Sequence, residues 1–153
     1  MAPVPFTDRE MQRAWRTNLD ASIHSSRSNA HRLLLFYSIE CGLKAVLMKR
    51  RSVNCTNLCN EIGEAQHNIN KLLDYLSAGR SLKLPVQLQM SSIKIQGNEI
   101  ERKLDAGRIN QVWRYGGCFI QAGSSYTSNT TEDDNIEKQL MRISEWIEQE
   151  LNS

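Results

Sequence analysis

The sequence predicts an all-α protein, a bundle of four to five helices in which residues 1–153 form a single domain. Three observations support this prediction. Apolar residues recur at helical spacing in several segments, residues suited to helix N-termini precede three of these segments, and the alternation typical of strands is confined to residues 80–97. A length of 153 residues suits one domain with its own hydrophobic core.

The first helix is expected to begin just after Thr7, because Thr7 and Glu10 have the spacing of a capping box. The second helix is expected over residues 29–51, with Ser28 or Asn29 as its cap. This second helix is apolar over more than half of its circumference, which predicts a central position in the bundle. The apolar stripe of the first helix consists of Met11, Trp15, Leu19 and Ile23.

The middle of the chain is less regular. Residues 52–66 are polar and are expected to form no regular element. A third helix is expected to begin at His67 and to end before Gly79. Residues 80–97 predict a short hairpin or an irregular insertion packed on the bundle, and residues 98–115 predict a return to helix.

The last helix is expected to follow a loop over residues 121–132, where Gly, Ser, Thr and Asn predominate. Thr131 and Asp134 have the spacing that caps a helix N-terminus. The apolar stripe of this helix is Ile136, Leu140, Ile143, Ile147 and Leu151.

Composition restricts the functional class only mildly. The net charge is +2, but residues 1–52 carry nine basic against four acidic side chains, whereas residues 116–153 carry two against seven. Such a distribution allows binding to RNA, and it equally allows the charges to neutralise one another within the fold or across a dimer. No apolar run is long enough to span a membrane, and no secretory signal is visible, so a cytoplasmic protein with free thiols is expected.

Side chains that could bind metal or transfer protons are few. Cys55, Cys59 and His67 form the only ligand-like cluster, and their spacing does not match a zinc site, so neither a metal nor a cofactor is expected. The sequence contains no phosphate-binding glycine loop and no nucleophile motif of common hydrolases. Histidine-based acid–base chemistry therefore has three candidates: His24, His31 and His67.

Three segments, in order along the chain, together resemble the HEPN-domain family. Residues 30–47 contain an apolar stretch followed by Glu40, three residues, Lys44 and further apolar residues, which is similar to the central helix of that family. Residues 67–76 resemble the helix that follows, which begins with His and carries spaced leucines. Residues 113–116 (Trp-Arg-Tyr-Gly) resemble its late Arg-Tyr corner. The resemblance implies a helical bundle.

The same residues suggest a polar site. Glu40 and Lys44 lie one helical turn apart on a largely apolar helix, and a buried charge pair is costly unless each member finds partners. Arg114 could supply such a partner, since its guanidinium can bind a carboxylate or a phosphate. We therefore predict that Glu40, Lys44, Arg114 and Tyr115 converge, either as a ligand pocket or as a structural network.

The resemblance implies two functions. Many HEPN proteins are RNA endonucleases with an Arg followed after four to six residues by His; here Phe119, Ile120 and Gln121 stand at that spacing from Arg114. The expected function is therefore a non-catalytic assembly subunit of a prokaryotic antiphage or toxin–antitoxin complex, as a homodimer or within a larger hetero-complex. The alternative is a metal-independent RNase or RNA-binding protein that uses Arg114, Tyr115 and His67, and a nucleotide is a further possible ligand.

Overall fold

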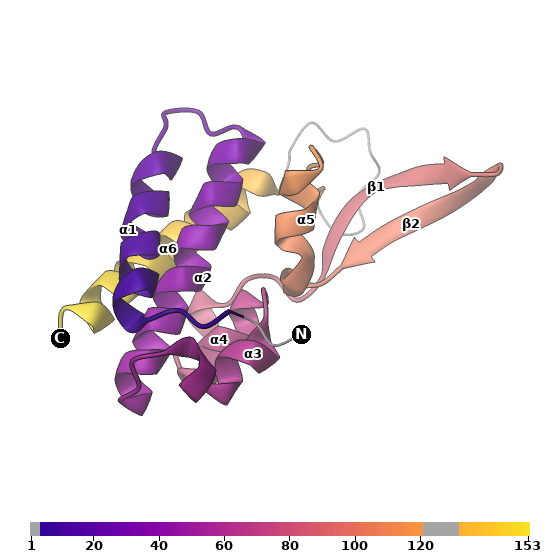
Figure 1. Ribbon diagram of the computed structural model, residues 1–153. Helices are drawn as coiled ribbons and strands as arrows, with labels where there is room; N and C mark the ends of the chain where they lie inside the picture. The colour runs from indigo at the N-terminus through magenta and orange to yellow at the C-terminus, as the bar shows by residue number, and fades with distance from the viewer. Residues whose placement is uncertain (1–3, 121–131) are drawn as a thin grey trace.

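The computed structural model describes residues 4–120 and 132–153. Over these residues the protein has six α-helices and one two-stranded antiparallel sheet (Figure 1). The helices are α1 (Asp8–Ser22), α2 (Asn29–Arg51), α3 (Asn60–Ala65), α4 (Ile69–Tyr75), α5 (Ile109–Arg114) and α6 (Asp133–Leu151). The strands are β1 (Leu88–Ile95) and β2 (Asn98–Leu104), and short 3₁₀ turns lie at Thr56–Leu58, Arg80–Leu82 and Ala106–Arg108.

The first two helices begin where the capping residues predict. The Thr7 side chain accepts a hydrogen bond from the Glu10 amide at 3.1 Å, and the Glu10 carboxylate accepts one from the Thr7 amide at 2.9 Å. Ser28 caps α2, and the His31 ring completes that capping box. Ile23, which was expected in the buried stripe of α1, is exposed because α1 ends at Ser22 and the backbone becomes extended there.

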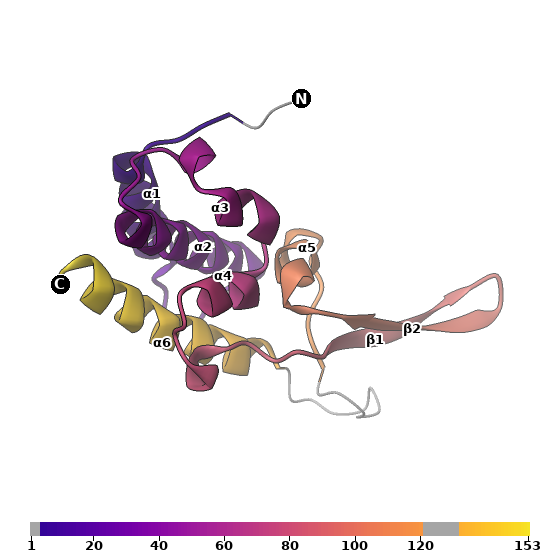
Figure 2. The same cartoon turned by 90° about the horizontal axis from the view of Figure 1, so that it is seen from below.

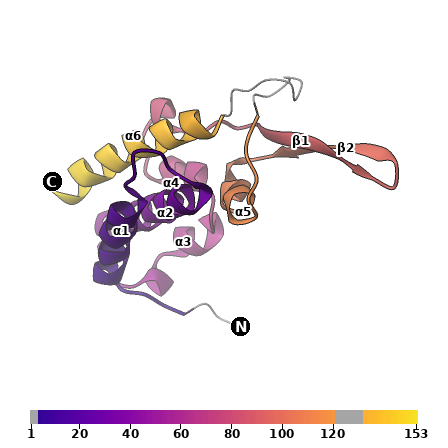
Figure 3. The same cartoon turned by 90° about the horizontal axis from the view of Figure 1, so that it is seen from above.

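Helix α2 is the centre of the helical body, as its apolar circumference predicts. It packs against α1, α4, α5 and α6, which surround it (Figures 1 and 3). Gly42 lies where α2 meets both α1 and α6, because a β-carbon there would lie 2.7 Å from Trp15 Nε1 and 2.9 Å from Ile147 Cδ1. The fully buried side chains of α2 include Leu35, Phe36, Ile39, Leu43, Leu47 and Met48.

Helix α6, near the C-terminus, packs against α2 and completes the helical body. Ile136, Leu140, Ile143 and Ile147 are buried, as expected, and Leu151 is partly buried. Polar contacts fix the start of the helix, since Glu137 accepts hydrogen bonds from Arg32 at 2.8 Å and from Arg27 at 3.3 Å. The predicted loop over residues 121–132 and the capping residue Thr131 lie outside the described residues, except for Glu132, which is the N-cap of α6.

The β-hairpin projects away from the helices (Figures 1 and 2). Its two strands are joined by Gln96 and Gly97, which both have positive φ angles of 52° and 82°. This backbone geometry is that of a two-residue hairpin turn, and glycine adopts it without steric cost. The pairing of Ile95 with Asn98 and of Ile93 with Ile100 follows from this turn.

A β-bulge between Met90 and Ile93 gives one face of the hairpin a row of apolar side chains, which Arg102 and Asn98 interrupt because they pair with Met90 and Ile95. Because Met90 and Ile93 are three residues apart, an unbroken alternation would direct their side chains to opposite faces, and the extra residue in the bulge restores the same face. The face begins in the core, where Leu88 is buried, and ends in solvent. Its apolar members are Leu88, Met90, Ile93, Ile95, Ile100 and Leu104.

The prediction of an all-α bundle of four to five helices was therefore wrong, because the protein is 61% helical with a two-stranded sheet and is a mixed α/β fold. The predicted insertion at residues 80–97 covers only β1 and the segment before it. Residues 98–104, which were expected to be helical, form β2 because the turn at Gln96–Gly97 brings them back along β1. The segment 52–66, expected to be irregular, contains the short helix α3.

The described part of the chain contains no helix with the length and apolar character needed to cross a membrane.

Candidate functional site

Glu40, Lys44 and His67 form one cluster between α2 and the segment that joins α3 to α4. Glu40 Oε2 accepts a hydrogen bond from Lys44 Nζ at 3.1 Å, and Glu40 Oε1 lies 2.8 Å from His67 Nδ1. Glu40 is only 7% exposed, whereas the His67 side chain is about half exposed. Because a carboxylate only accepts hydrogen bonds, the Nδ1 atom of His67 carries the proton that it shares with Glu40.

The α2 helix explains why the first two of these side chains meet. Glu40 and Lys44 are four residues apart on the same helix, with the acidic residue first, which is the favourable order. Both are largely buried, and a buried ion pair needs additional hydrogen bonds to offset its desolvation. His67 supplies one of these bonds, because the chain after α3 returns to α2 immediately before α4 begins.

A cavity of about 550 Å³ adjoins this cluster. Residues 4–6 cover one side of it, and they are held in place by backbone pairing with the segment before α3: the Thr56 amide donates to Phe6 O at 2.8 Å, and the Phe6 amide donates to Thr56 Oγ1 at 2.9 Å. Both apolar and polar residues line the cavity. Its lining residues include Val4, Phe6, Met11, Glu40, Lys44, Asn57, Ile62, Gln66 and His67.

Arg114 belongs to a second cluster. Its Nη2 atom donates a hydrogen bond to the Tyr37 hydroxyl at 2.6 Å, and this bond raises the pKa of the Arg114 guanidinium above its usual value. Tyr115, the next residue, is 78% exposed. Tyr37 and Glu40 are both on α2, but among the described residues no hydrogen bond or ion pair joins Arg114 or Tyr115 to Glu40 or Lys44. The structure thus joins Glu40, Lys44 and His67 by hydrogen bonds and joins Arg114 to Tyr37, three residues before Glu40 on α2.

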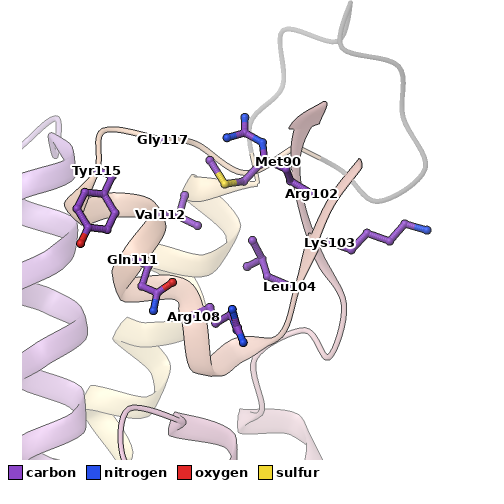
Figure 4. A pocket seen from close by; sticks show the side chains of 9 residues that line it. All are labelled: Met90, Arg102, Lys103, Leu104, Arg108, Gln111, Val112, Tyr115 and Gly117. Atoms are coloured by element: carbon purple, nitrogen blue, oxygen red, sulfur yellow. The ribbon is translucent and has the colours of Figure 1, made fainter. Parts of the chain in front are cut away.

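A basic groove of about 470 Å³ lies near Tyr115, between α5 and the base of the hairpin (Figure 4). Leu104 and Val112 form its apolar floor, and the guanidinium groups of Arg102 and Arg108 stand at its two ends, while the Lys103 side chain points away. Arg102 Nε donates to the Ser91 carbonyl at 2.8 Å. The Arg108 guanidinium makes no hydrogen bond or ion pair with any of residues 4–120 and 132–153.

The sequence did not indicate this groove. Arg102 and Arg108 were interpreted as residues of one helix, whereas they lie on β2 and in the turn before α5. Gly97 was the available signal, because a glycine between two runs of alternating residues is typical of a hairpin turn. Tyr37 gave no signal, since its contact with Arg114 joins residues 77 positions apart.

The cysteines take part in neither cluster, although Cys41 is next to Glu40. Burial raises the pKa of the Cys41 thiol to about 11, and the Glu40 charge adds to the effect. Cys59 donates to Glu61 at 3.0 Å, and burial together with this bond raises the pKa of Cys59 to about 11. Among the described residues no three His, Cys, Asp or Glu side chains are placed to hold a metal ion.

No protein-family model, curated protein or solved structure matches this chain significantly. The resemblance to HEPN domains therefore depends on the sequence pattern of residues 30–47, 67–76 and 113–116 alone.

Proposed function

We propose that this protein is a non-catalytic, HEPN-related assembly subunit of a prokaryotic antiphage or toxin–antitoxin complex in the cytoplasm, and that its β-hairpin binds a second copy of the chain. The observation that carries the proposal is the apolar face of the hairpin. Ile93, Ile95 and Ile100 are 39%, 51% and 40% exposed, and they continue a face whose base is buried in the core.

An apolar face that is exposed on two strands is more stable when another element packs against it and removes it from water. An isolated two-stranded hairpin is marginally stable in water, and a sheet with one apolar face normally packs against another element. Among the described residues no element covers the face beyond Met90. A partner that covers the three isoleucines would therefore stabilise both the hairpin and the complex.

A second copy of the chain fits this face better than a strongly charged partner. The polar face of the hairpin carries both signs of charge, with Lys94 paired opposite Glu99 and Lys103 close to Glu101. On the apolar face the one charged residue is Arg102, near the base, so two such hairpins can meet at the isoleucine ends of this face without strong repulsion. Their apolar faces can pack against each other in two layers, the arrangement by which sheets bury isoleucine side chains. The interface is then the same patch on both copies.

The molar mass in solution tests this proposal. We expect size-exclusion chromatography with light scattering to give the mass of a dimer for the natural chain. Replacing Ile95 and Ile100 together by serine should give a monomer, because it removes the apolar contact. The matched control replaces Lys94 and Glu101 by serine, on the same strands but on the polar face, and should remain dimeric.

Two results would contradict the proposal. One is a monomeric natural chain at concentrations of about 100 μM, well above the dissociation constant expected of a specific interface. The other is an equal effect of the two double variants, which would mean that hairpin stability rather than the apolar face sets the mass. Circular dichroism of each variant shows whether the helical body remains folded.

The basic groove supports RNA binding as a second candidate function. Arg102 and Arg108 lie at its two ends and have no acidic partner in the described part of the chain, and Tyr115 offers an exposed ring nearby. Guanidinium groups bind phosphates, and aromatic rings stack on unpaired bases.

Fluorescence anisotropy with a single-stranded RNA tests this second function. Replacing Arg102 and Arg108 by alanine should weaken binding at least tenfold and should reduce its salt dependence by about one phosphate contact per arginine. The control is Lys138→Ala, an exposed cation on α6. Equal affinity of both variants would exclude the groove as the RNA site.

A further inference from the structure

We infer that the cavity beside Glu40 binds a small zwitterion, an α-amino acid with an apolar side chain. The inference is independent of the hairpin and of the assembly function. It depends on the geometry of Glu40, Lys44 and His67, which line the cavity, and on the apolar residues that line it with them.

The cluster has unused hydrogen-bonding capacity at buried atoms. Lys44 Nζ has three protons, and the structure uses one of them, in the bond to Glu40 Oε2. Each carboxylate oxygen of Glu40 has one protein partner, although each can accept two hydrogen bonds. Unsatisfied capacity of buried charged groups costs free energy, so a ligand that completes these bonds is favoured.

The charges of the cluster select the kind of ligand. Glu40 and Lys44 are opposite charges 3.1 Å apart, so their sum is zero and the pair forms a strong local dipole. An anion would be attracted by Lys44 and repelled by Glu40, and a cation would meet the reverse. A ligand that carries both charges on groups attached to one carbon avoids either repulsion, and an α-amino acid is the simplest such molecule.

Each end of an α-amino acid has a partner in this arrangement. Its carboxylate can accept from the free protons of Lys44 Nζ. Its ammonium group can donate to the Glu40 carboxylate, because each carboxylate oxygen has an unused acceptor position. His67 does not contact the ligand in this arrangement, and it holds the Glu40 carboxylate in place through Nδ1.

The lining of the cavity also suits an apolar side chain. Val4, Phe6, Met11 and Ile62 line it, and Phe6 is partly exposed, so its ring is available for contact. A volume of about 550 Å³ is within the range of small-molecule sites. Contact with these four side chains favours an apolar over a polar amino acid, because a polar side chain packed against them would lose its hydrogen bonds with water.

Thermal unfolding of the full chain with three related probes tests the inference. L-phenylalanine carries both charges, 3-phenylpropanoate lacks the ammonium group, and 2-phenylethylamine lacks the carboxylate. We expect L-phenylalanine at about 10 mM to raise the Tm by about 2–4 °C, and the other two probes to raise it by less than 1 °C. No rise with L-phenylalanine or L-leucine, or equal rises with all three phenyl probes, would overturn the inference.

Variants locate the binding. Lys44→Met and Glu40→Gln should each abolish the Tm rise, whereas Lys71→Met, on the exposed side of α4, should retain it. If the two cluster variants do not fold, Phe6→Ala replaces them, because Phe6 lines the cavity and carries no charge. Retention of the full Tm rise by Phe6→Ala would place the amino acid elsewhere and would contradict the inference.

Discussion

At the scale of single residues, burial determines which polar side chains keep their ordinary chemistry. Asp133, the first residue of α6, is almost fully buried, and its carboxylate accepts from Trp113 Nε1 at 2.6 Å and from the Phe119 amide at 3.2 Å. Burial raises the pKa of Asp133, and these hydrogen bonds only partly oppose the effect. The same cause raises the pKa of Cys41 and of Cys59.

Asp133 should therefore make stability depend on pH in the acid range. Since the folded pKa is higher than the unfolded value of about 3.9, the folded state binds a proton more tightly than the unfolded state. The contribution of Asp133 is greatest below the unfolded pKa and is lost as the pH rises through the folded pKa. We expect the Tm difference between the natural chain and Asp133→Asn to shrink from pH 3 towards pH 6, as measured by calorimetry. A difference that grows over this range would contradict the sign of the shift.

The four cysteines should react with iodoacetamide in a clear order. Cys118 is exposed, whereas Cys41 and Cys59 are shielded and, with a pKa of about 11, are almost entirely protonated at pH 8. Peptide mass spectrometry should therefore detect labelling of Cys118 within minutes and none at Cys41 or Cys59. In guanidinium chloride all four should be labelled. Rapid native labelling of Cys41 would show that α2 is less protected than the structure indicates.

At the scale of elements, the sequence predicted the long helices and a possible hairpin at residues 80–97, and it missed strand β2. Thr7, Ser28 and the stripe from Ile136 to Ile147 are local signals, so α1, α2 and α6 could be found from residues close in the chain. Strand β2 could not, because Glu99, Glu101, Arg102 and Lys103 are residues that helices tolerate and only pairing with β1 makes them a strand.

In the candidate site, too, contacts between residues close in the chain could be predicted, and contacts between distant residues could not. The Glu40–Lys44 pair is a contact within one helix, and its spacing predicted it. The contact of Glu40 with His67 joins positions 27 residues apart, and the contact of Arg114 with Tyr37 joins positions 77 apart. Such contacts depend on how helices are arranged, which spacing along the chain does not specify.

Gly42 should be the most restrictive position where helices α1, α2 and α6 meet. A β-carbon there would lie within 3 Å of the Trp15 indole and of Ile147, and all three groups are in the core. Overpacking of this kind costs about 1–3 kcal/mol, so Gly42→Ala should lower the free energy of unfolding by that amount. Urea denaturation measures it. Gly63→Ala, with no atoms near its β-carbon, is the control and should change stability by less than about 0.5 kcal/mol.

At the scale of the whole molecule, the protein consists of a helical body and a projecting arm. The body buries its apolar residues around α2, and the hairpin carries its apolar face beyond the region that the body covers (Figure 2). The polar sites are on different parts of this frame: the Glu40 cavity is beneath the N-terminal segment, and the basic groove is at the base of the arm.

The bulge between Met90 and Ile93 bears on how such arms can associate. A two-stranded arm has two open edges, and flat open edges allow chains to add one after another into filaments. A bulge bends and twists its strand, and the extra residue interrupts the regular row of amide and carbonyl groups that another strand would need. The bulge therefore disfavours the addition of further strands at the edges. Contact through the isoleucine face is still possible, and two copies that pack face to face cover both of these faces completely. The inserted residue thus favours a closed pair over an open-ended polymer.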